Sequence, residues 1–244
     1  MLPGLYSAAS GLDVSIRNQE AIAHNLAHVN VPGFRRSSVA FESFESTLEE
    51  AEFGNLSSSS GVSETGYIDF TPGTYEQTGR SLDVAIKGDG FFSVEAPDGP
   101  VFTRAGSFVI GPTGQLVNHN GYPVLGEGGP IQFPADVSSG EIEISTNGQI
   151  RFRGNRVGQL QLTSFEDNQK LVPYGTTLYQ AGPEAVTAAA DIEIQQGYRE
   201  LSNVSPTHEL VQMIVGMRFY EMSSRAMNAI SSAIQQNTNL QQGG

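Results

Sequence analysis

The N-terminal region reads LYSAASGLDVSIRNQEAIAHNLAHVNVPGF over residues 5–34. Small and apolar side chains recur there at alternating intervals of four and three residues, which is the spacing of a coiled-coil helix. The stripe consists of Leu5, Ala9, Leu12, Ile16, Gln19, Ala23 and Leu26. Pro32 disfavours helix in the residue before it and Gly33 permits a turn, so this stretch predicts one long helix that ends before them.

A second helical pattern closes the chain. Ser205 is a suitable N-cap, and Pro206 fits the first helical position. The apolar stripe that follows consists of Val211, Val215, Phe219, Met222, Ala226, Ala229 and Ala233, continuing to Gln236 and Leu240. We expect Leu5, Leu12, Ile16 and Leu26 of the first helix to pack against Val215, Phe219, Met222 and Ala229 of this stripe. We also expect both helices to pack against other subunits.

Both helical segments carry few charges. Residues 1–34 contain only Asp13, Arg17 and Glu20. Residues 202–244 contain only Glu209, Arg218, Glu221 and Arg225. The formal net charge of −13 therefore resides almost entirely in the middle of the chain. Helices with so few solubilising charges are expected to be covered by neighbouring molecules.

The middle of the chain has the pattern of an antiparallel β protein. Residues 82–87 alternate apolar and polar side chains, which predicts a half-buried strand. Turn signals at 98–99, 111–114 and 146–148 separate further short strands. Residues 35–80 read as an extended connector with one short helix over 39–53.

These patterns predict an α+β fold. Residues 1–34 and 202–244 are expected to pair as a coiled-coil-like inner domain. Residues 81–201 are expected to form a β-rich outer domain, joined through the connector 35–80.

Several functional classes lack a signal. The absence of cysteine excludes disulfides and thiolate chemistry. No basic stripe indicates nucleic-acid binding, and no apolar run is long enough for membrane insertion. His24 and His28 are four residues apart, but no neighbouring glutamate or third ligand accompanies them, so neither a metal nor a cofactor is expected. No nucleophile motif or carboxylate pair indicates an enzyme.

A family resemblance rests on residues 22–34, IAHNLAHVNVPGF. The stretch resembles the N-terminal signature of bacterial flagellar rod and hook proteins, in which Asn is usual at the positions of His24 and His28 and Thr at Val31. The matching signature residues are Asn25, Leu26, Ala27, Asn30, Pro32, Gly33 and Phe34. Further blocks resemble the family in order at residues 81–92, 102–108, 112–117, 157–162 and 197–213.

The resemblance implies a structural subunit of the flagellar basal-body rod that crosses the periplasm. Its implied partners are like subunits, neighbouring rod proteins and the flagellar type III export apparatus. The start Met1-Leu2-Pro3 lacks the basic residues of a Sec signal, so we expect export without signal cleavage. Residues 121–126 and 129–131 favour the proximal (FlgF) type, whereas 202–204 resemble the distal (FlgG) type. A hook-type or adhesin-like filament subunit and a peptidoglycan-acting enzyme on an axial scaffold are the alternatives.

Overall fold

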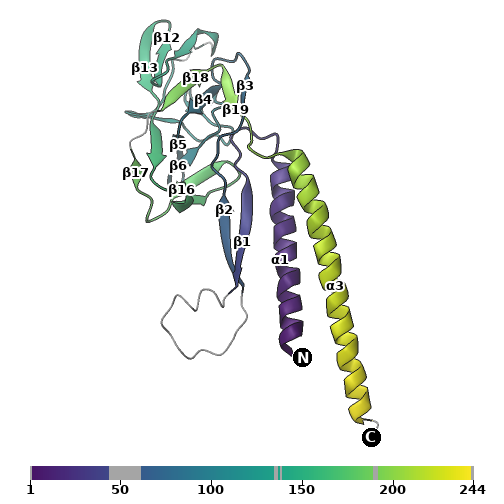
Figure 1. The fold of residues 1–244 in the computed structure, drawn as a ribbon. Helices are drawn as coiled ribbons and strands as arrows, with labels where there is room; N and C mark the ends of the chain where they lie inside the picture. Colours follow the sequence, from purple (N-terminus) through teal and green to yellow (C-terminus); the bar gives the residue numbers. More distant parts are fainter. Residues whose placement is uncertain (1, 44–61, 135–136, 138, 189–191, 243–244) are drawn as a thin grey trace. The chain divides into compact units, whose positions relative to one another are not determined.

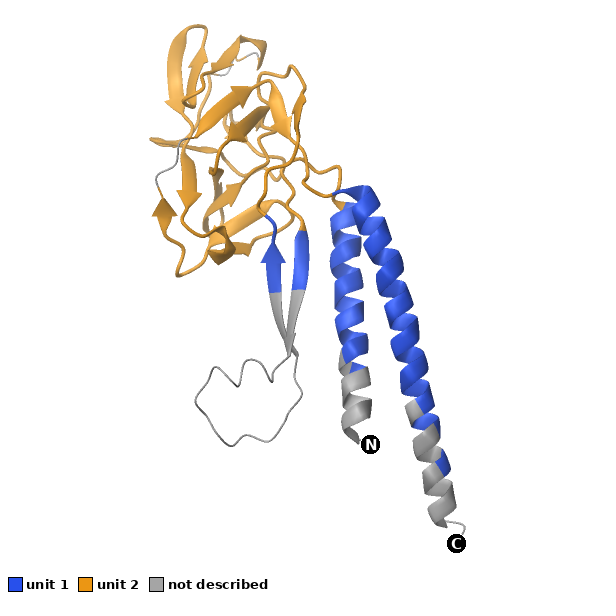
Figure 2. Ribbon diagram, in the orientation of Figure 1, with its two compact units in different colours: residues 1–27, 37–69, 205–244 blue, residues 28–36, 70–204 orange. Residues whose placement is uncertain are grey.

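The computed structural model describes residues 2–43, 62–134, 137, 139–188 and 192–242. These residues form two long helices and a large set of antiparallel strands, as expected for an α+β protein (Figure 1). The chain divides into two compact units, which are coloured in Figure 2. One contains residues 1–27, 37–69 and 205–244, and the other contains residues 28–36 and 70–204. We call them the helical unit and the β unit.

The helical unit is built from both ends of the chain. Helix α1 spans Leu2–Ala27 and helix α3 spans Pro206–Gln242. Strands β1 (Ser37–Ser43) and β2 (Val62–Ile68) pair antiparallel in the same unit. Residues 39–43 are thus strand rather than helix, because their backbone groups pair with residues 62–66. The rest of that predicted helix lies outside the described residues.

The β unit contains one large sheet and several small ones. Its six-stranded sheet has the order β15-β16-β6-β5-β14-β17, and β11-β12-β13 form a three-stranded sheet. Two-stranded pairs are β18-β4, β19-β3, β10-β9 and β7-β8. The strand bounds are Tyr75–Gln77 (β3), Val84–Lys87 (β4), Phe91–Ala96 (β5), Gly99–Thr103 (β6), Val109–Ile110 (β7), Leu116–Val117 (β8), Leu125–Gly126 (β9), Gly129–Pro130 (β10), Ile142–Ile144 (β11), Gln149–Phe152 (β12), Asn155–Gln159 (β13), Leu162–Phe165 (β14), Leu171–Pro173 (β15), Leu178–Ala181 (β16), Thr187–Ala188 (β17), Glu193–Gln196 (β18) and Tyr198–Glu200 (β19). Short 3-10 turns occupy Ser139–Glu141 and Asn168–Lys170.

The three predicted turns are confirmed. The pairs β7-β8 and β11-β12 are antiparallel and flank the turn signals at 111–114 and 146–148. The antiparallel pair β5-β6 turns at residues 97–98, one residue before the predicted 98–99, and Gly99 begins β6. The strand predicted at 82–87 is present as β4 over Val84–Lys87, but it is not half-buried, since Asp83 and Ala85 are as buried as their apolar neighbours. Asp83 is accommodated because Thr78 donates a hydrogen bond of 2.7 Å to its carboxylate.

One hydrophobic core fills the β unit. It brings together side chains from β4, β5, β8, β12 and β18, among them Val84, Phe92, Leu116, Ile150 and Ile194. Phe92 meets Phe108 edge-on, with ring centroids 5.1 Å apart. Phe34, which precedes the large sheet by almost sixty residues, is also only 1 % exposed and stacks with His28 at 5.1 Å.

We expect Phe34→Ala to lower the free energy of unfolding by about 3–5 kcal/mol, because a fully buried ring is replaced by a cavity. Urea unfolding followed by near-UV circular dichroism measures this. Phe219→Ala, at a side chain that is 48 % exposed, is the control and should change the value by less than about 1 kcal/mol. Equal effects of the two variants would contradict the assignment of Phe34 to the core.

Candidate assembly site

Helices α1 and α3 contact each other through short and polar side chains. The Ser15 hydroxyl donates to the carbonyl of Gly216 at 3.3 Å, and the Gln19 amide donates to the carbonyl of Met213 at 2.9 Å. A side chain at Gly216 would place its Cβ 2.5 Å from Nε2 of Gln19. The absence of a side chain there therefore permits the close approach of the two helices.

Asn25 connects three segments of the helical unit. Its side chain is buried and forms two hydrogen bonds with the backbone of Ser37 in β1, one accepted from N at 2.9 Å and one donated to O at 2.7 Å. The same amide lies 3.4 Å from Oε2 of Glu209, which is fully buried in the first turn of α3. One side chain thus fixes α1 against both β1 and α3.

A hollow of about 280 Å³ lies where α1, α3 and β1 meet. Val14, Val39, Val215 and Phe219 give it an apolar lining, and Gln212 and Asn18 are among its polar residues. Val215 and Phe219 remain 55 % and 48 % exposed. Apolar side chains of this size are more often buried, and a group of exposed ones is typical of a protein-interaction surface.

In the β unit, residues 28–36 are fastened to the segment that precedes α3. Gly33 has a positive φ of 72° and donates its N–H to the carbonyl of Glu200 at 2.8 Å. A side chain at this position would overlap the backbone of Ala105. The backbone N–H of Arg36 donates to Oδ1 of Asn203 at 2.7 Å. Gly33 is required here for both its conformation and its lack of a side chain.

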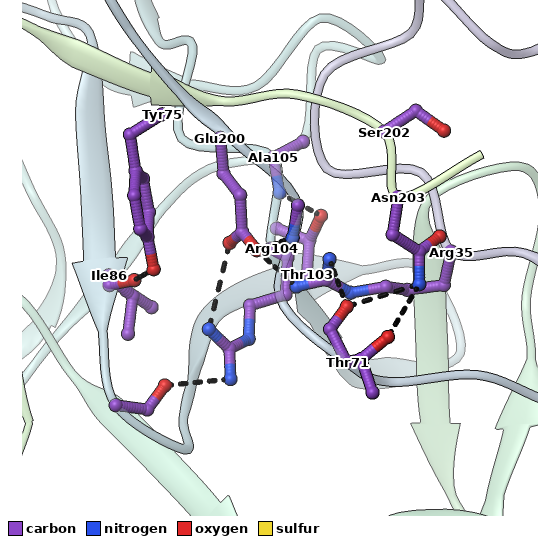
Figure 3. A network of polar contacts seen from close by, with 12 residues as sticks. Arg35, Thr71, Tyr75, Ile86, Thr103, Arg104, Ala105, Glu200, Ser202 and Asn203 are labelled. Carbon is purple, nitrogen blue, oxygen red and sulfur yellow. Dashed lines mark hydrogen bonds and ion pairs between the residues drawn. The ribbon is translucent and has the colours of Figure 1, made fainter. Parts of the chain in front are cut away.

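A buried ion cluster reinforces this junction (Figure 3). Glu200 lies between Arg35 and Arg104, and all three side chains are at most 2 % exposed. Arg35 Nη2 donates to Glu200 Oε1 at 2.6 Å, and Arg104 Nη1 lies 3.6 Å from Oε2. The N–H of Gly73 also donates to Oε1, at 3.0 Å. The carboxylate therefore holds segments from distant parts of the sequence.

The cluster contains two guanidinium groups and one carboxylate. Burial lowers the pKa of Arg104, although Glu200 opposes the shift. The guanidinium is further supported by the carbonyl of Gly88 at 2.9 Å and by the ring of Phe91, 5.2 Å away. Burial and the Glu200 carboxylate raise the pKa of the nearby Tyr75. These contacts favour a structural role, because the charges bind protein groups rather than face a cavity.

Among the described residues, no group of three or more His, Asp or Glu side chains could hold a metal ion. No helix in the described part of the chain is long and apolar enough to span a membrane.

Two protein-family models match separate parts of the chain. The Flagellar hook protein FlgE/F/G D1 domain model matches residues 85–152, and the Flagellar basal body rod FlgEFG protein C-terminal model matches residues 195–240. Flagellar basal-body rod protein FlgF of Mesorhizobium japonicum is 34 % identical over 96 % of this chain and 95 % of its own. FlgG of Bacillus subtilis is 33 % identical over 98 % and 99 %. FlgF of Rhizobium meliloti is 33 % identical over 91 % and 90 %. The chain belongs to the flagellar basal-body rod protein family.

The family signature residues belong partly to the helical unit and partly to the β unit, and they differ in burial. Asn25, Gly33 and Phe34 are buried, Leu26 and Pro32 are half-buried, and Ala27 and Asn30 are exposed. Asn25 anchors the helical unit and Gly33 anchors the junction in the β unit, as described above. The signature of this rod-protein family therefore combines residues with separate structural tasks.

The residues predicted for subunit packing are mostly exposed in the single chain. Leu12 is half-buried, whereas exposed side chains are Ile16, Val211, Val215, Phe219, Met222, Ala226 and Ala229. The side chains of Leu5 and Ala233 lie outside the described part. Within the chain, α3 turns Glu209, Met213 and Gly216 toward α1, so the apolar stripe is at most partly covered there. It stays a prediction for contacts between copies.

Sequence reasoning missed the buried polar residues. Arg35 follows the signature directly, and Glu200 precedes the motif Ser202-Asn203-Val204, but no local pattern links residues so far apart. Their location in the sequence was the one available signal, because Arg35 and Glu200 each lie in or beside a block that resembles the family. Gly216 was detectable as a glycine inside a helical pattern, which usually has a packing reason.

We expect Gly216→Leu to separate α1 from α3 and to reduce helical content, because the new side chain must occupy the space of Gln19. Gly11→Leu is the matched control, since a Cβ at this α1 glycine meets nothing within 4 Å. That control should raise helix stability by up to about 1 kcal/mol. Thermal melts followed at 222 nm compare the two, and a stabilised Gly216→Leu variant would contradict the close contact.

We expect Glu200→Gln to lower the free energy of unfolding by about 3–5 kcal/mol, because two buried guanidiniums lose their counter-charge. Glu76→Gln is a control in the adjacent strand, where Glu76 forms an exposed 2.7 Å ion pair with Arg199. It should cost at most about 1 kcal/mol. Urea unfolding measures both, and similar losses would show that the burial of Glu200 is energetically unimportant.

Proposed function

We propose that this chain is a structural subunit of the bacterial flagellar basal-body rod. It assembles through its terminal helices into the axial shaft that crosses the periplasm and transmits torque from the motor to the hook. The apolar face of α3 carries the proposal. Side chains as large as Val211 and Met222 are 57 % and 61 % exposed, within the segment that matches the rod-protein C-terminal model. A repeating assembly would bury this surface at every subunit.

In this proposal residues 1–34 and 202–244 form a coiled-coil-like inner domain close to the axis. Residues 81–201 form the outer domain, and residues 35–80 connect the two. The low charge of the helices suits burial in a shaft, whereas the acidic middle of the chain suits solvent. The partners are like subunits and neighbouring rod proteins. The type III export apparatus delivers the chain.

Within the rod, we propose the proximal position of the FlgF type. The alignment with B. subtilis FlgG runs over 267 residues, more than the 244 of this chain, so that FlgG contains insertions absent here. The alignment with M. japonicum FlgF runs over 236 residues at nearly the same coverage. Identities of 34 % and 33 % are too similar to favour either type, so the support comes from length.

Phe219→Asp and Leu12→Asp test the role of the helices. In cells that lack the wild-type gene, both variants should fail to enter the basal body and should abolish motility, because a carboxylate is placed in a contact between subunits. The variant β units should still fold, which near-UV circular dichroism checks.

Val172→Asp is the matched control, because this valine is 53 % exposed on β15 of the β unit. It should support normal motility. Normal amounts of Phe219→Asp and Leu12→Asp in isolated basal bodies, together with normal swimming, would refute assembly through the helices.

A further inference from the structure

Each long helix carries an exposed stripe that contains both apolar and charged side chains. On α1 the stripe consists of Ala9, Asp13, Ile16, Glu20, Ala23 and Ala27, all exposed. The residues follow steps of four and three, which is the heptad spacing of a coiled-coil seam. Contacts within the chain use other α1 residues, namely Ser15, Gln19 and Asn25. Among the described residues, the polar contact of the outer α1 stripe is the exposed ion pair of Asp13 with Arg17 in the same helix.

The outer α3 stripe has the same spacing. It consists of Val211, Val215, Arg218, Met222, Arg225 and Ala229, all exposed. The two stripes have opposite charges at their seam positions, with two carboxylates on α1 and two guanidiniums on α3. Neither Glu20 nor Arg218 forms an ion pair with any described residue. Unpaired charges on apolar stripes are costly to cover unless the covering surface carries opposite charges.

One antiparallel register matches the two stripes at every position. When Glu20 lies opposite Arg218, Asp13 falls opposite Arg225 and Ile16 opposite Met222. The same register places Ala23 opposite Val215, and Ala27 opposite Val211. A shift of one heptad either way pairs only one acid with an arginine. It leaves Asp13 facing Ser232 in one direction and Glu20 facing Val211 in the other. The charges therefore select one register.

We propose that a second copy of this chain docks its outer α1 stripe onto the outer α3 stripe in this register. The proposal rests on the proposed function and names the contact between subunits. Within one chain α1 and α3 are antiparallel, since Ser15 meets Gly216 and Gln19 meets Met213. Two copies that point the same way therefore present antiparallel helices to each other. Matching the stripes displaces the second copy by about six residues, roughly 9 Å along the helix axis.

The contact is heterologous, because one copy contributes α1 and the other contributes α3. Such a contact repeats from copy to copy and generates rings or open helices rather than closed pairs. The exposed ion pairs Asp13–Arg17 and Glu221–Arg225 within each helix do not prevent it. Exposed pairs of this kind stabilise a helix only weakly, because water screens the two charges.

Disulfide trapping tests the register, and the chain has no cysteine of its own. Ile16→Cys with Met222→Cys, introduced in one chain and oxidised in isolated basal bodies, should give a ladder of covalent multimers on a non-reducing gel. Ile16→Cys with Val215→Cys is the control, one heptad out of register at a site of similar exposure. Its yield should be at least tenfold lower.

Charge exchange provides the second readout. Glu20→Arg and Arg218→Glu should each reduce the amount of chain in basal bodies at least tenfold. Their combination should restore it to within about twofold of wild type. Glu20→Arg with Arg225→Glu leaves the same net charge as the matched exchange but should not restore incorporation. In this register it places the new arginine opposite Arg218 and the new glutamate opposite Asp13, so both pairs have like charges.

Three results would overturn the proposed contact: equal trapping in both cysteine variants, covalent products only with a different protein, or no recovery in the matched exchange. Absence of the wild-type chain from basal bodies, measured by mass spectrometry, would instead refute the proposed function itself. Both sets of substitutions lie at exposed helical positions, so circular dichroism of the purified variants should match the wild type.

Discussion

The burial of the Glu200 carboxylate between Arg35 and Arg104 is the constraint on which the organisation of the chain depends. The chain leaves α1 at Ala27 and reaches α3 at Pro206, with a β unit of well over a hundred residues between them. Glu200 and Asn203 hold the outgoing and returning segments together through Arg35, Gly33 and Arg36. The segment that follows α1 and the segment that precedes α3 are thus held side by side within the β unit.

The two helical ends were predictable because their evidence is local. Heptad spacing, a Ser205-Pro206 start and a Pro32-Gly33 stop each depend on residues within a few positions. The hairpin turns were predictable for the same reason, since a sequence such as Asn147-Gly148 defines its own geometry. Local evidence of this kind located α1, α3 and the strand pairs β5-β6, β7-β8 and β11-β12.

What sequence could not supply depends on distant partners. The buried carboxylate of Asp83 accepts a hydrogen bond from Thr78 and lies 3.6 Å from Arg80, and an alternating pattern cannot reveal such partners. Residues 39–43 resemble a helix locally but pair with β2, so tertiary contacts override local preference. On α3 the side chain of Glu209 and the carbonyl of Gly216 bond to α1, and a pattern of apolar residues does not reveal such polar contacts. Hydrophobic periodicity identifies the apolar face of a helix but does not show which segment or which other molecule packs against that face.

The opposite charges of the two outer stripes have a consequence for polymers of this chain. A shaft joined by α1 of one copy and α3 of the next has two chemically different ends. One end always presents an acidic stripe and the other a basic stripe. Such a filament is polar, so the two directions along it are not equivalent.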